Sequence, residues 1–284
     1  MSDPCTQPLP DEFAEPLARA ADRLGLFAGR ILWYPDVPST NDLAASLAEG
    51  GAPEGCLVVA NAQSAGRGRH GRSWVSPAGA GLYVSAVLRP ARTAVPMLTI
   101  AAGVAVAEGI RAATGLSPHL KWPNDVYAGD RKVAGVLAEA SSTVAAAVPA
   151  TPVEAGLQVR LPGIPYVVLG IGINVMPAAY PPDVAVRATS LEAELGRVVD
   201  RGLLLAECLS ALARRYADLH EGLTAGVLDA WRARAAPTLG RRVGWDAAGT
   251  RLEGVAEDID AAGGLVVRTR TGRITVTSGE MIWL

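Results

Sequence analysis

Three arginines on a glycine-rich segment are the residues of this chain best suited to binding chemistry. The segment runs Gly66-Arg67-Gly68-Arg69-His70-Gly71-Arg72, and no aspartate or glutamate occurs between Gly55 and Ala107. Guanidinium groups bind phosphate or carboxylate through paired hydrogen bonds, and glycines let a backbone come close to a ligand. Because the whole chain has a net charge of −2, this positive charge is local. The segment therefore predicts a loop that holds anions.

The same segment matches the dinucleotide-binding pattern G-x-G-x-x-G. That fingerprint needs a helix directly after the loop and an acidic residue about 20 positions later. Here Ser73-Trp74-Val75-Ser76-Pro77 and Gly79-Ala80-Gly81 follow, which cannot start a helix, and the acidic residue is missing. No Lys-Ser or Lys-Thr pair closes the motif as in a P-loop. A solvated basic loop and an RNA-binding segment remain open alternatives, although a single copy in an acidic chain disfavours RNA.

A second polar group is Lys121-Trp122-Pro123-Asn124-Asp125, followed by Lys132-Val133-Ala134-Gly135. A Pro-Asn-Asp turn exposes two polar side chains at the end of a strand, where functional sites are common. Lys132 begins an apolar strand, so its ammonium group either reaches water or points into a cleft. Asp125 taken alone is equally explained as a turn residue.

Two further motifs each have a structural explanation as well as a functional one. Glycines inside a strand, as in Gly170-Ile171-Gly172-Ile173-Asn174-Val175, indicate either a bulge or the close approach of a ligand or backbone. Ser39-Thr40-Asn41 suits the N-terminal cap of a helix, and Gln63 is a possible polar partner. His70, His119 and His220 are scattered, and no zinc-like spacing or nucleophile elbow occurs. An enzyme with these residues would work by positioning and charge stabilisation.

Composition bounds the class of protein. A chain of 284 residues with 50% hydrophobic content can form one large domain and a small one. Its pI near 6.0 argues against a general nucleic-acid or membrane-surface binder. Three cysteines without a CxxC pair indicate a reducing cytosol. No secretory signal is evident, and the apolar stretch 94–107 contains Pro96 and is too short to span a bilayer.

The elements that must position these motifs follow from hydrophobic periodicity and turn signals. Residues 1–16 suggest a loose tail and 17–27 weak helical character. A short helix follows the cap at Ser39 or Thr40, and a hairpin loop is expected over 141–154. Strands are expected over 31–34, 57–60, 82–88, 133–139, 157–161 and 166–175. Longer helices are expected over 97–113, 200–221 and 225–235. From residue 240, short strands and turns indicate a separate β-barrel of about 45 residues.

Taken together, the quoted segments resemble the biotin protein ligases, in the order typical of that family and over most of residues 31–284. The resemblance implies an α+β fold: a mixed or antiparallel sheet with helices, like class II aminoacyl-tRNA synthetases, and a small C-terminal SH3-like β-barrel. It implies a tail and short helix over 1–28 without a winged-helix domain, a catalytic domain over 29–236 and the barrel over 237–284.

The activity that the resemblance implies has two steps. Biotin and ATP, with Mg²⁺ on the phosphates, give biotinyl-5′-AMP and pyrophosphate. A lysine of the biotin carboxyl carrier domain of an acyl-CoA carboxylase, such as acetyl-CoA carboxylase, then takes the biotin. The expected protein is a cytoplasmic monomer or weak homodimer without DNA or membrane partners. The nearest alternative is a lipoate or octanoyl ligase of the same fold. A polar site favours the ureido ring of biotin over a bare acyl chain.

The family's site residues transfer onto matching positions of this chain, with no metal ligand among protein side chains. Catalysis would fall to Lys132, Arg67 and Asp125. Biotin would be bound by Ser39, Thr40, Asn41, Gln63, Arg67, Gly68, Arg69, Lys132 and Gly135. ATP and the adenylate would be bound by Arg67, Arg69, Arg72, Trp74, Asn124, Lys132 and Asn174. The loop 177–191 would order over adenine, and the insertion 141–154 has no assigned role.

Overall fold

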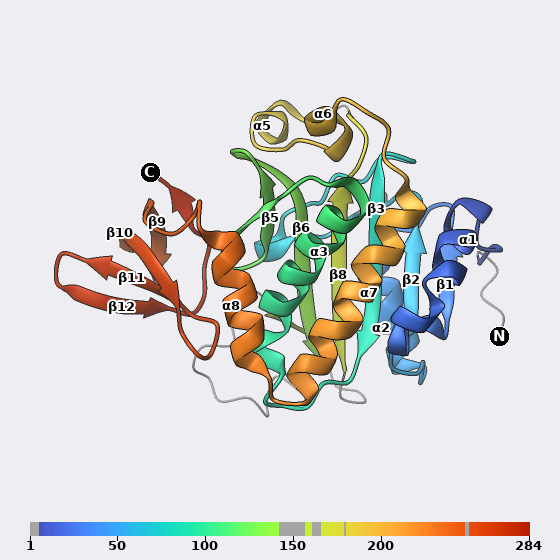
Figure 1. Cartoon of the computed structure of the whole chain (residues 1–284), viewed down its shortest axis with the longest axis horizontal. Helices are drawn as coiled ribbons and strands as arrows, with labels where there is room; N and C mark the ends of the chain where they lie inside the picture. The colour runs from blue at the N-terminus through green and yellow to red at the C-terminus, as the bar shows by residue number, and fades with distance from the viewer. Residues whose placement is uncertain (1–5, 142–156, 161–165, 179, 248–249) are drawn as a thin grey trace.

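A mixed β-sheet forms the centre of the molecule (Figure 1). The computed structural model describes residues 6–141, 157–160, 166–178, 180–247 and 250–284. Within them the sheet has eight strands in the order β1-β2-β3-β8-β6-β5-β4, with β7 beside β6. The strands are β1 (Ile31–Tyr34), β2 (Leu57–Ala60), β3 (Gly81–Leu88), β4 (His119–Lys121), β5 (Asp125–Ala128), β6 (Arg131–Ser141), β7 (Leu157–Arg160) and β8 (Val167–Asn174).

Most neighbouring strands of this sheet are antiparallel, whereas β1 with β2 and β6 with β7 are parallel. A parallel pair cannot be joined by a simple hairpin. The predicted hairpin over 141–154 is therefore wrong as a topology, and residues 142–156 themselves lie outside the described part. The expected α+β class with a mixed sheet is confirmed.

Three helices cover one face of the sheet: α3 (Leu98–Thr114), α7 (Arg201–His220) and α8 (Thr224–Ala235) (Figure 1). Alternate β3 side chains such as Leu82, Val84 and Leu88 pack into this core. The stretch Val95–Thr114 is long and apolar enough to cross a membrane, which corrects the expected shortness of this segment. Since 78% of its most apolar window is buried within the protein, it is the core helix of the fold.

The opposite face carries α2 (Thr40–Glu49). The helix begins at Ser39, whose Oγ accepts a hydrogen bond from the Asp42 amide at 3.3 Å, and it ends at Gly50. Ala44, Ala45 and Ala48 are fully buried against β2 and β3. Small residues on this side let the helix approach the sheet closely, so that its first turn reaches the central strands.

The N-terminal helix begins earlier in the chain than the sequence predicted. Helix α1 (Asp11–Arg19) occupies part of the expected loose tail, and two short 3₁₀ turns follow, η1 (Ala21–Arg23) and η2 (Gly25–Ala28). Proline density suggested a tail, but Pro16 lies inside the helix and is buried. Phe13 packs on Trp33 with ring centroids 5.1 Å apart. Tertiary packing thus overrides the local signal.

Short helical turns also interrupt the proline-rich loop after β8, namely α5 (Pro182–Ala185) and α6 (Leu191–Leu195). Two 3₁₀ turns lie elsewhere, η3 (Arg69–Gly71) in the arginine segment and η4 (Val95–Met97) before α3. Pro181 and Pro182 fix the start of α5, as proline suits the first turn of a helix.

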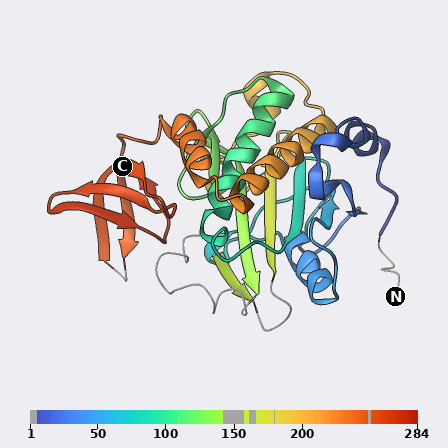
Figure 2. The same ribbon diagram turned by 60° about the horizontal axis from the view of Figure 1, so that its bottom comes forward.

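The C-terminal residues form a second, antiparallel sheet in the order β12-β11-β10-β9-β13. Figures 1 and 2 show it as a separate lobe at one end of the main sheet. Trp122 Nε1 donates a hydrogen bond to the Gly263 carbonyl at 2.8 Å and so connects the two lobes. The strands lie in the region from residue 240 where short strands were expected: β9 (Arg242–Ala247), β10 (Thr250–Ile259), β11 (Leu265–Thr269), β12 (Gly272–Val276) and β13 (Ile282–Trp283).

Candidate functional site

The floor of the site is a stretch of nearly bare backbone on the α2 side of β8 and β6. A Cβ atom on Gly172 would lie 2.5 Å from Trp74 Nε1, and one on Gly170 would overlap the Asn41 carboxamide. The register of β8 with both neighbours is regular, so the bulge interpretation of these glycines is wrong. They allow the close approach of side chains from α2 and from the arginine segment.

Thr40 and Asn41, at the start of α2, are joined to Gln63 and Ser85 in one hydrogen-bonded network. The Thr40 amide donates to Gln63 Oε1 at 2.8 Å, and Ser85 Oγ donates to Asn41 Oδ1 at 2.6 Å. Ser39 is the predicted cap, and Gln63 is the predicted polar partner. The network gives one end of the site a set of fixed donors and acceptors suited to a polar ring.

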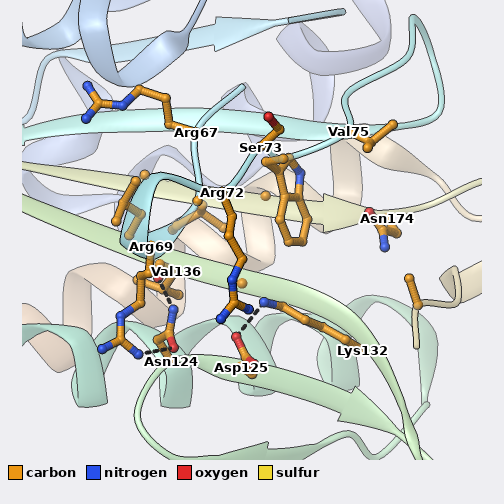
Figure 3. Close-up of a pocket in the computed structure, with 18 of the residues that line it drawn as sticks. Arg67, Arg69, Arg72, Ser73, Val75, Asn124, Asp125, Lys132, Val136 and Asn174 are labelled. Carbon is orange, nitrogen blue, oxygen red and sulfur yellow. Dashed lines mark hydrogen bonds and ion pairs between the residues drawn. The ribbon is translucent and has the colours of Figure 1, made fainter. Parts of the chain in front are cut away.

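A buried carboxylate lies behind this network. Glu139 on β6 is 0% exposed; its Oε2 accepts from Asn41 Nδ2 at 2.6 Å, and its Oε1 lies 2.8 Å from a terminal nitrogen of Arg67. The other terminal nitrogen of Arg67 lies 2.7 Å from Asp42 Oδ1. Figure 3 shows that Arg67 points away from Lys132. Two carboxylates thus hold this predicted catalytic arginine apart from the other cations.

The arginine segment is a folded turn whose ends pair with each other. The Gly68 amide donates to the Arg72 carbonyl at 2.7 Å, and Trp74 donates to Gly66 at 2.8 Å. Gly71 has a φ of 71°, where a side chain would be strained. A Cβ on Gly66 would meet the Trp74 carbonyl. This fold corrects the alternative of a freely solvated basic loop, and β3 rather than a helix follows it, as the sequence indicated.

The other two arginines of the segment contact the turn after β4 and the C-terminal lobe; Figure 3 shows the contact between Arg69 and Asn124. Arg69 donates to Asn124 Oδ1 at 3.1 Å and to the Gly279 carbonyl at 3.2 Å. Arg72 forms a two-point ion pair with Glu280, whose Oε1 accepts at 2.8 Å. Burial lowers the pKa of Arg69, which Asp125 and Glu280 oppose. The hydrogen bond from Arg72 lowers the pKa of the Glu280 carboxyl below its usual range.

Lys132 points into the site. Of the two interpretations of its position, the one in which the ammonium group enters a cleft is therefore correct. A β-bulge between β5 and β6 shifts the register beside it, and a bulge re-aims the side chains around it. Lys132 and Gly135, three positions apart, thereby share a face: a Cβ on Gly135 would lie 3.0 Å from Lys132 Nζ. The ammonium lies 2.5 Å from Asp125 Oδ1 and 5.2 Å from the centroid of Trp74.

The segment that carries α5 and α6 fixes the backbone of Lys132. The Lys132 amide donates to the Arg187 carbonyl at 2.8 Å, and the Thr189 amide donates to the Lys132 carbonyl at 2.9 Å. Tyr180 and Val184 from the same segment line the pocket. The backbone of Lys132, which lies on β6, is therefore also hydrogen-bonded to the segment between α5 and α6.

The chain has only one other lysine, Lys121. Its Nζ lies 4.6 Å from the ring centroid of Trp283 and 5.4 Å from that of Tyr127. Burial lowers its pKa, and Asp125 and Glu280 act in the opposite direction. Aromatic rings from both lobes therefore enclose this ammonium group.

One pocket of about 210 Å³ brings together every site residue that the sequence predicted. The predicted residues on its wall are Ser39, Thr40, Asn41, Gln63, Arg67, Gly68, Arg69, Arg72, Trp74, Asn124, Asp125, Lys132, Gly135 and Asn174. Within the described part of the chain, no group of three or more His, Cys, Asp or Glu side chains is arranged as metal ligands.

Sequence reasoning missed several residues of the site. Glu139 carried a signal, because it is the only charged residue in the apolar run 133–140. Ser85 carried a weaker one as the only polar residue among buried β3 side chains after Tyr83. Glu280 carried none, since its partner Arg72 lies 208 positions away in the sequence.

Comparisons with known proteins agree with this geometry. Residues 33–148 match the biotin/lipoate A/B protein ligase family, and residues 238–283 match the biotin protein ligase C-terminal domain. The chain is 34% identical to the biotin–[acetyl-CoA-carboxylase] ligase of Mycobacterium tuberculosis over 255 residues, which cover 87% of this chain and 86% of that protein. It is 35% identical to the Paracoccus denitrificans ligase of the same name over 258 residues, covering 86% and 97% respectively.

Two further comparisons concern length and fold. The bifunctional ligase/repressor of Bacillus subtilis is 37% identical over 210 residues, and the match spans 71% of this chain but only 59% of that protein. The biotin protein ligase of Aquifex aeolicus, solved with biotin and ATP, has a TM-score of 0.71 and 27% identity over 90% of this chain and 99% of that one. The chain belongs to the biotin/lipoate protein ligase family. Its C-terminal domain and full-length relatives place it among the biotin protein ligases.

Proposed function

We propose that the protein is an ATP-dependent biotin protein ligase that modifies a lysine of a biotin carrier domain. The observation that carries the proposal is the position of Lys132, whose ammonium group lies in the same pocket as a neutral polar network and a cluster of arginines. The relatives named as biotin–[acetyl-CoA-carboxylase] ligases support it. From the Bacillus relatives the proposal takes only the ligase activity, because the match spans 59% of their length.

The reaction has two nucleophilic steps. A carboxylate oxygen of biotin attacks the α-phosphorus of ATP; the bond to the β-phosphate oxygen breaks, and pyrophosphate leaves. The neutral amine of the carrier lysine then attacks the carbonyl carbon of biotinyl-5′-AMP. An amide forms, AMP leaves with the electrons of the broken C–O bond, and the amine releases a proton.

Charge stabilisation is the main contribution that this site can make. Two anionic groups about 4 Å apart repel by on the order of 4 kcal/mol at an effective dielectric constant of 20. We propose that Lys132 bridges the biotin carboxylate and the α-phosphate, while Arg69 and Arg72 bind phosphate oxygens. Arg67 completes the set from the biotin side. Asp125 holds Lys132, from which it is 2.5 Å away.

The remaining residues are proposed to bind the two substrates. Ser39, Thr40, Asn41 and Gln63 would bind the ureido ring of biotin, with Gly68 and Gly135 beside its acyl chain. Trp74, Asn124 and Asn174 would contact the nucleotide, and the segment 177–191 would cover adenine. Asn124 accepts a hydrogen bond from Arg69, and Asp125 contacts Lys132, so both present side-chain oxygens where the phosphates are proposed to bind. Two such ligands suit Mg²⁺ held chiefly by phosphates, where it would reduce the repulsion between the substrates.

Partner, compartment and domain limits are part of the same proposal. The acceptor is the biotin carboxyl carrier domain of an acyl-CoA carboxylase, and the compartment is the cytoplasm. Cys56 and Cys208 are buried free thiols, as expected in a reducing environment. We propose a monomer or weak homodimer, with a tail and short helix over 1–28, a catalytic domain over 29–236 and a barrel over 237–284.

A lipoate or octanoyl ligase is the competing function within the family. Thr40, Gln63, Ser85 and Asn41 form a polar network that a bare acyl chain could not use, and this favours biotin. An RNA-binding role is disfavoured because the chain has a net charge of −2 and carries a single copy of the arginine-glycine segment. Binding to a nucleic-acid backbone depends on an excess of positive charge.

Biotin- and ATP-dependent labelling of a carrier domain, followed by mass spectrometry, tests this function. The wild type should attach one biotin, and Lys132→Ala should lower the rate by about 100-fold or more, since a charge-stabilising group is lost. Arg131→Ala is the matched control: this neighbouring side chain is half exposed and pairs with Glu194, so the rate should stay unchanged. Labelling with lipoate but not biotin would support the competing function, and no labelling with either would refute the ligase activity.

A further inference from the structure

We propose that Glu139 is a positioning residue for biotin, acting through Arg67 and Asn41. This inference rests on the proposed function. The carboxylate is 0% exposed and contacts both of these pocket residues, at 2.8 and 2.6 Å. It does not itself line the pocket. These two contacts give Glu139 a route by which it can affect a ligand in the pocket.

The first effect is on the orientation of the Asn41 carboxamide. An ionised carboxylate only accepts hydrogen bonds, so Glu139 requires the Nδ2 atom of Asn41 to point toward it. Ser85 donates to the Oδ1 atom on the other side, at 2.6 Å. Gly170 leaves the space in which the carboxamide sits. The two hydrogen bonds fix the amide in one of its two orientations, as recognition of a ring with distinct donors and acceptors requires.

The second effect is on the guanidinium of Arg67. This side chain is 35% exposed and has two carboxylate partners, of which Glu139 is buried and Asp42 is 48% exposed. A pair with a buried partner is screened little by water, whereas a pair with an exposed partner contributes little. Glu139 therefore dominates the position of the guanidinium, which lines the biotin end of the pocket.

The partners of Glu139 also compensate for the burial of its carboxylate. An unpaired charge in the interior is very unfavourable, and a pair supported by additional hydrogen bonds compensates for it. Glu139 has both an ion pair and a hydrogen bond from Asn41. It is the only charged residue in the run 133–140 of β6, where packing alone would be served by an apolar side chain. A role in orienting the ligand-binding residues explains its presence.

Steady-state kinetics of adenylate formation in Glu139→Gln and Glu139→Asp provide the test. Glutamine keeps the shape but presents an amide to Arg67 or Asn41, so the KM for biotin should rise by about tenfold or more. The KM for ATP should change less than the KM for biotin, because Glu139 contacts Arg67 and Asn41 at the biotin end of the pocket. Aspartate keeps the charge but withdraws it by one methylene group, and its effect on the KM for biotin should be smaller.

Asp42→Asn is the comparison variant, because it removes the other partner of Arg67 and should raise the KM for biotin far less. Equal increases in both KM values, or a loss of thermal stability with the KM for biotin unchanged, would overturn the inference. If Glu139→Gln does not fold, the aspartate variant decides by the same ratio of KM values. A wild type that forms no biotinyl-AMP would instead refute the proposed function.

Discussion

Gly135, Gly170 and Gly172 leave part of the pocket floor without side chains, and two large side chains occupy the space above them. Trp74 lies over Gly172, and Asn41 lies over Gly170. A Cβ atom at either position would collide with a residue that other hydrogen bonds or ring contacts hold in place. Absent side chains thus shape this site as much as the charged groups do.

Gly170→Ala should distort the site through Asn41. The new methyl group would lie 2.9 Å from Asn41 Cγ, and Asn41 is held by Ser85 and Glu139. Overpacking of this kind costs about 1–3 kcal/mol, so the free energy of unfolding should fall by that amount and the KM for biotin should rise. Urea denaturation and adenylate kinetics measure the two effects.

Gly226→Ala is the control for that substitution. Gly226 lies on the exposed side of α8 with nothing within 4 Å of its Cβ position. Alanine should stabilise the protein by about 0.5–1 kcal/mol through its helix propensity, without an effect on kinetics. An unchanged KM for biotin in Gly170→Ala would show that Asn41 can move freely.

The sequence predicted the polar residues of the pocket better than their pairing. Local patterns predicted a helix cap at Ser39 or Thr40, and they indicated Gln63 as a possible polar partner of this segment. The pairing of Arg67 with Glu139, and of Arg72 with Glu280, joins positions far apart in the chain. Because one arginine offers the same donors to any carboxylate, residue types alone do not select the partner.

At the scale of elements, the arginine segment joins four parts of the fold. Its backbone pairs with itself, Arg67 contacts α2 and β6, and Arg69 contacts the turn after β4 and the C-terminal lobe. A segment tied at several points can cover a bound intermediate and exclude water from it.

Arg69→Gly should therefore weaken retention of the adenylate. The substitution removes the hydrogen bonds to Asn124 and to Gly279, so the turn is less restrained. The rate at which biotinyl-5′-AMP dissociates should therefore rise by about tenfold. Release of labelled adenylate after gel filtration measures this rate. Arg92→Gly, an exposed arginine in the same acid-free stretch, should release it at the wild-type rate. Equal rates in both variants would exclude a covering role.

Elements with strong periodicity were predicted well, whereas those defined by contacts were not. The core helix α3 and the strands β3 and β8 follow from their apolar patterns. Helix α1 did not, because it is stabilised by packing against α7 and Trp33. The bulge beside Lys132 was also beyond sequence reasoning: it depends on how β5 and β6 align, and no residue type signals it.

At the scale of the whole molecule, the second lobe supplies part of the site wall. Gly279 and Glu280, which precede β13, contact Arg69 and Arg72. The lobe's strands were predictable from their turns, but its contacts with the pocket were not, since turn patterns carry no information on docking.

Glu280→Gln should loosen the arginine segment, because it removes the charge that Arg72 contacts. Trypsin should cleave after Arg67, Arg69 or Arg72 faster than in the wild type. Glu253→Gln, which removes a surface partner of Arg242 in the same lobe, should leave cleavage unchanged. Equal cleavage of wild type and Glu280→Gln would show that the lobe does not restrain the segment.

The Arg72–Glu280 contact should also respond to acid with a defined sign. The pKa of Glu280 is lowered from its ordinary value of 4.5, chiefly by the hydrogen bond from Arg72. A carboxyl whose folded pKa is depressed contributes its stabilisation fully above the unfolded value and loses it as the pH falls through the folded value. The contact is therefore complete at pH 7, and an NMR titration of the Glu280 carboxyl should place its midpoint below 4.5.

The lysine content of the chain has a consequence for its own chemistry. A ligase of this kind makes an acyl adenylate that can react with any accessible amine, its own included. This chain offers 24 arginines but only two lysines, one paired with Asp125 and the other enclosed by Tyr127 and Trp283. Guanidinium groups remain protonated and are poor nucleophiles. Under the proposed function, the chain therefore offers the adenylate few side-chain amines of its own, which favours the acceptor lysine as its target.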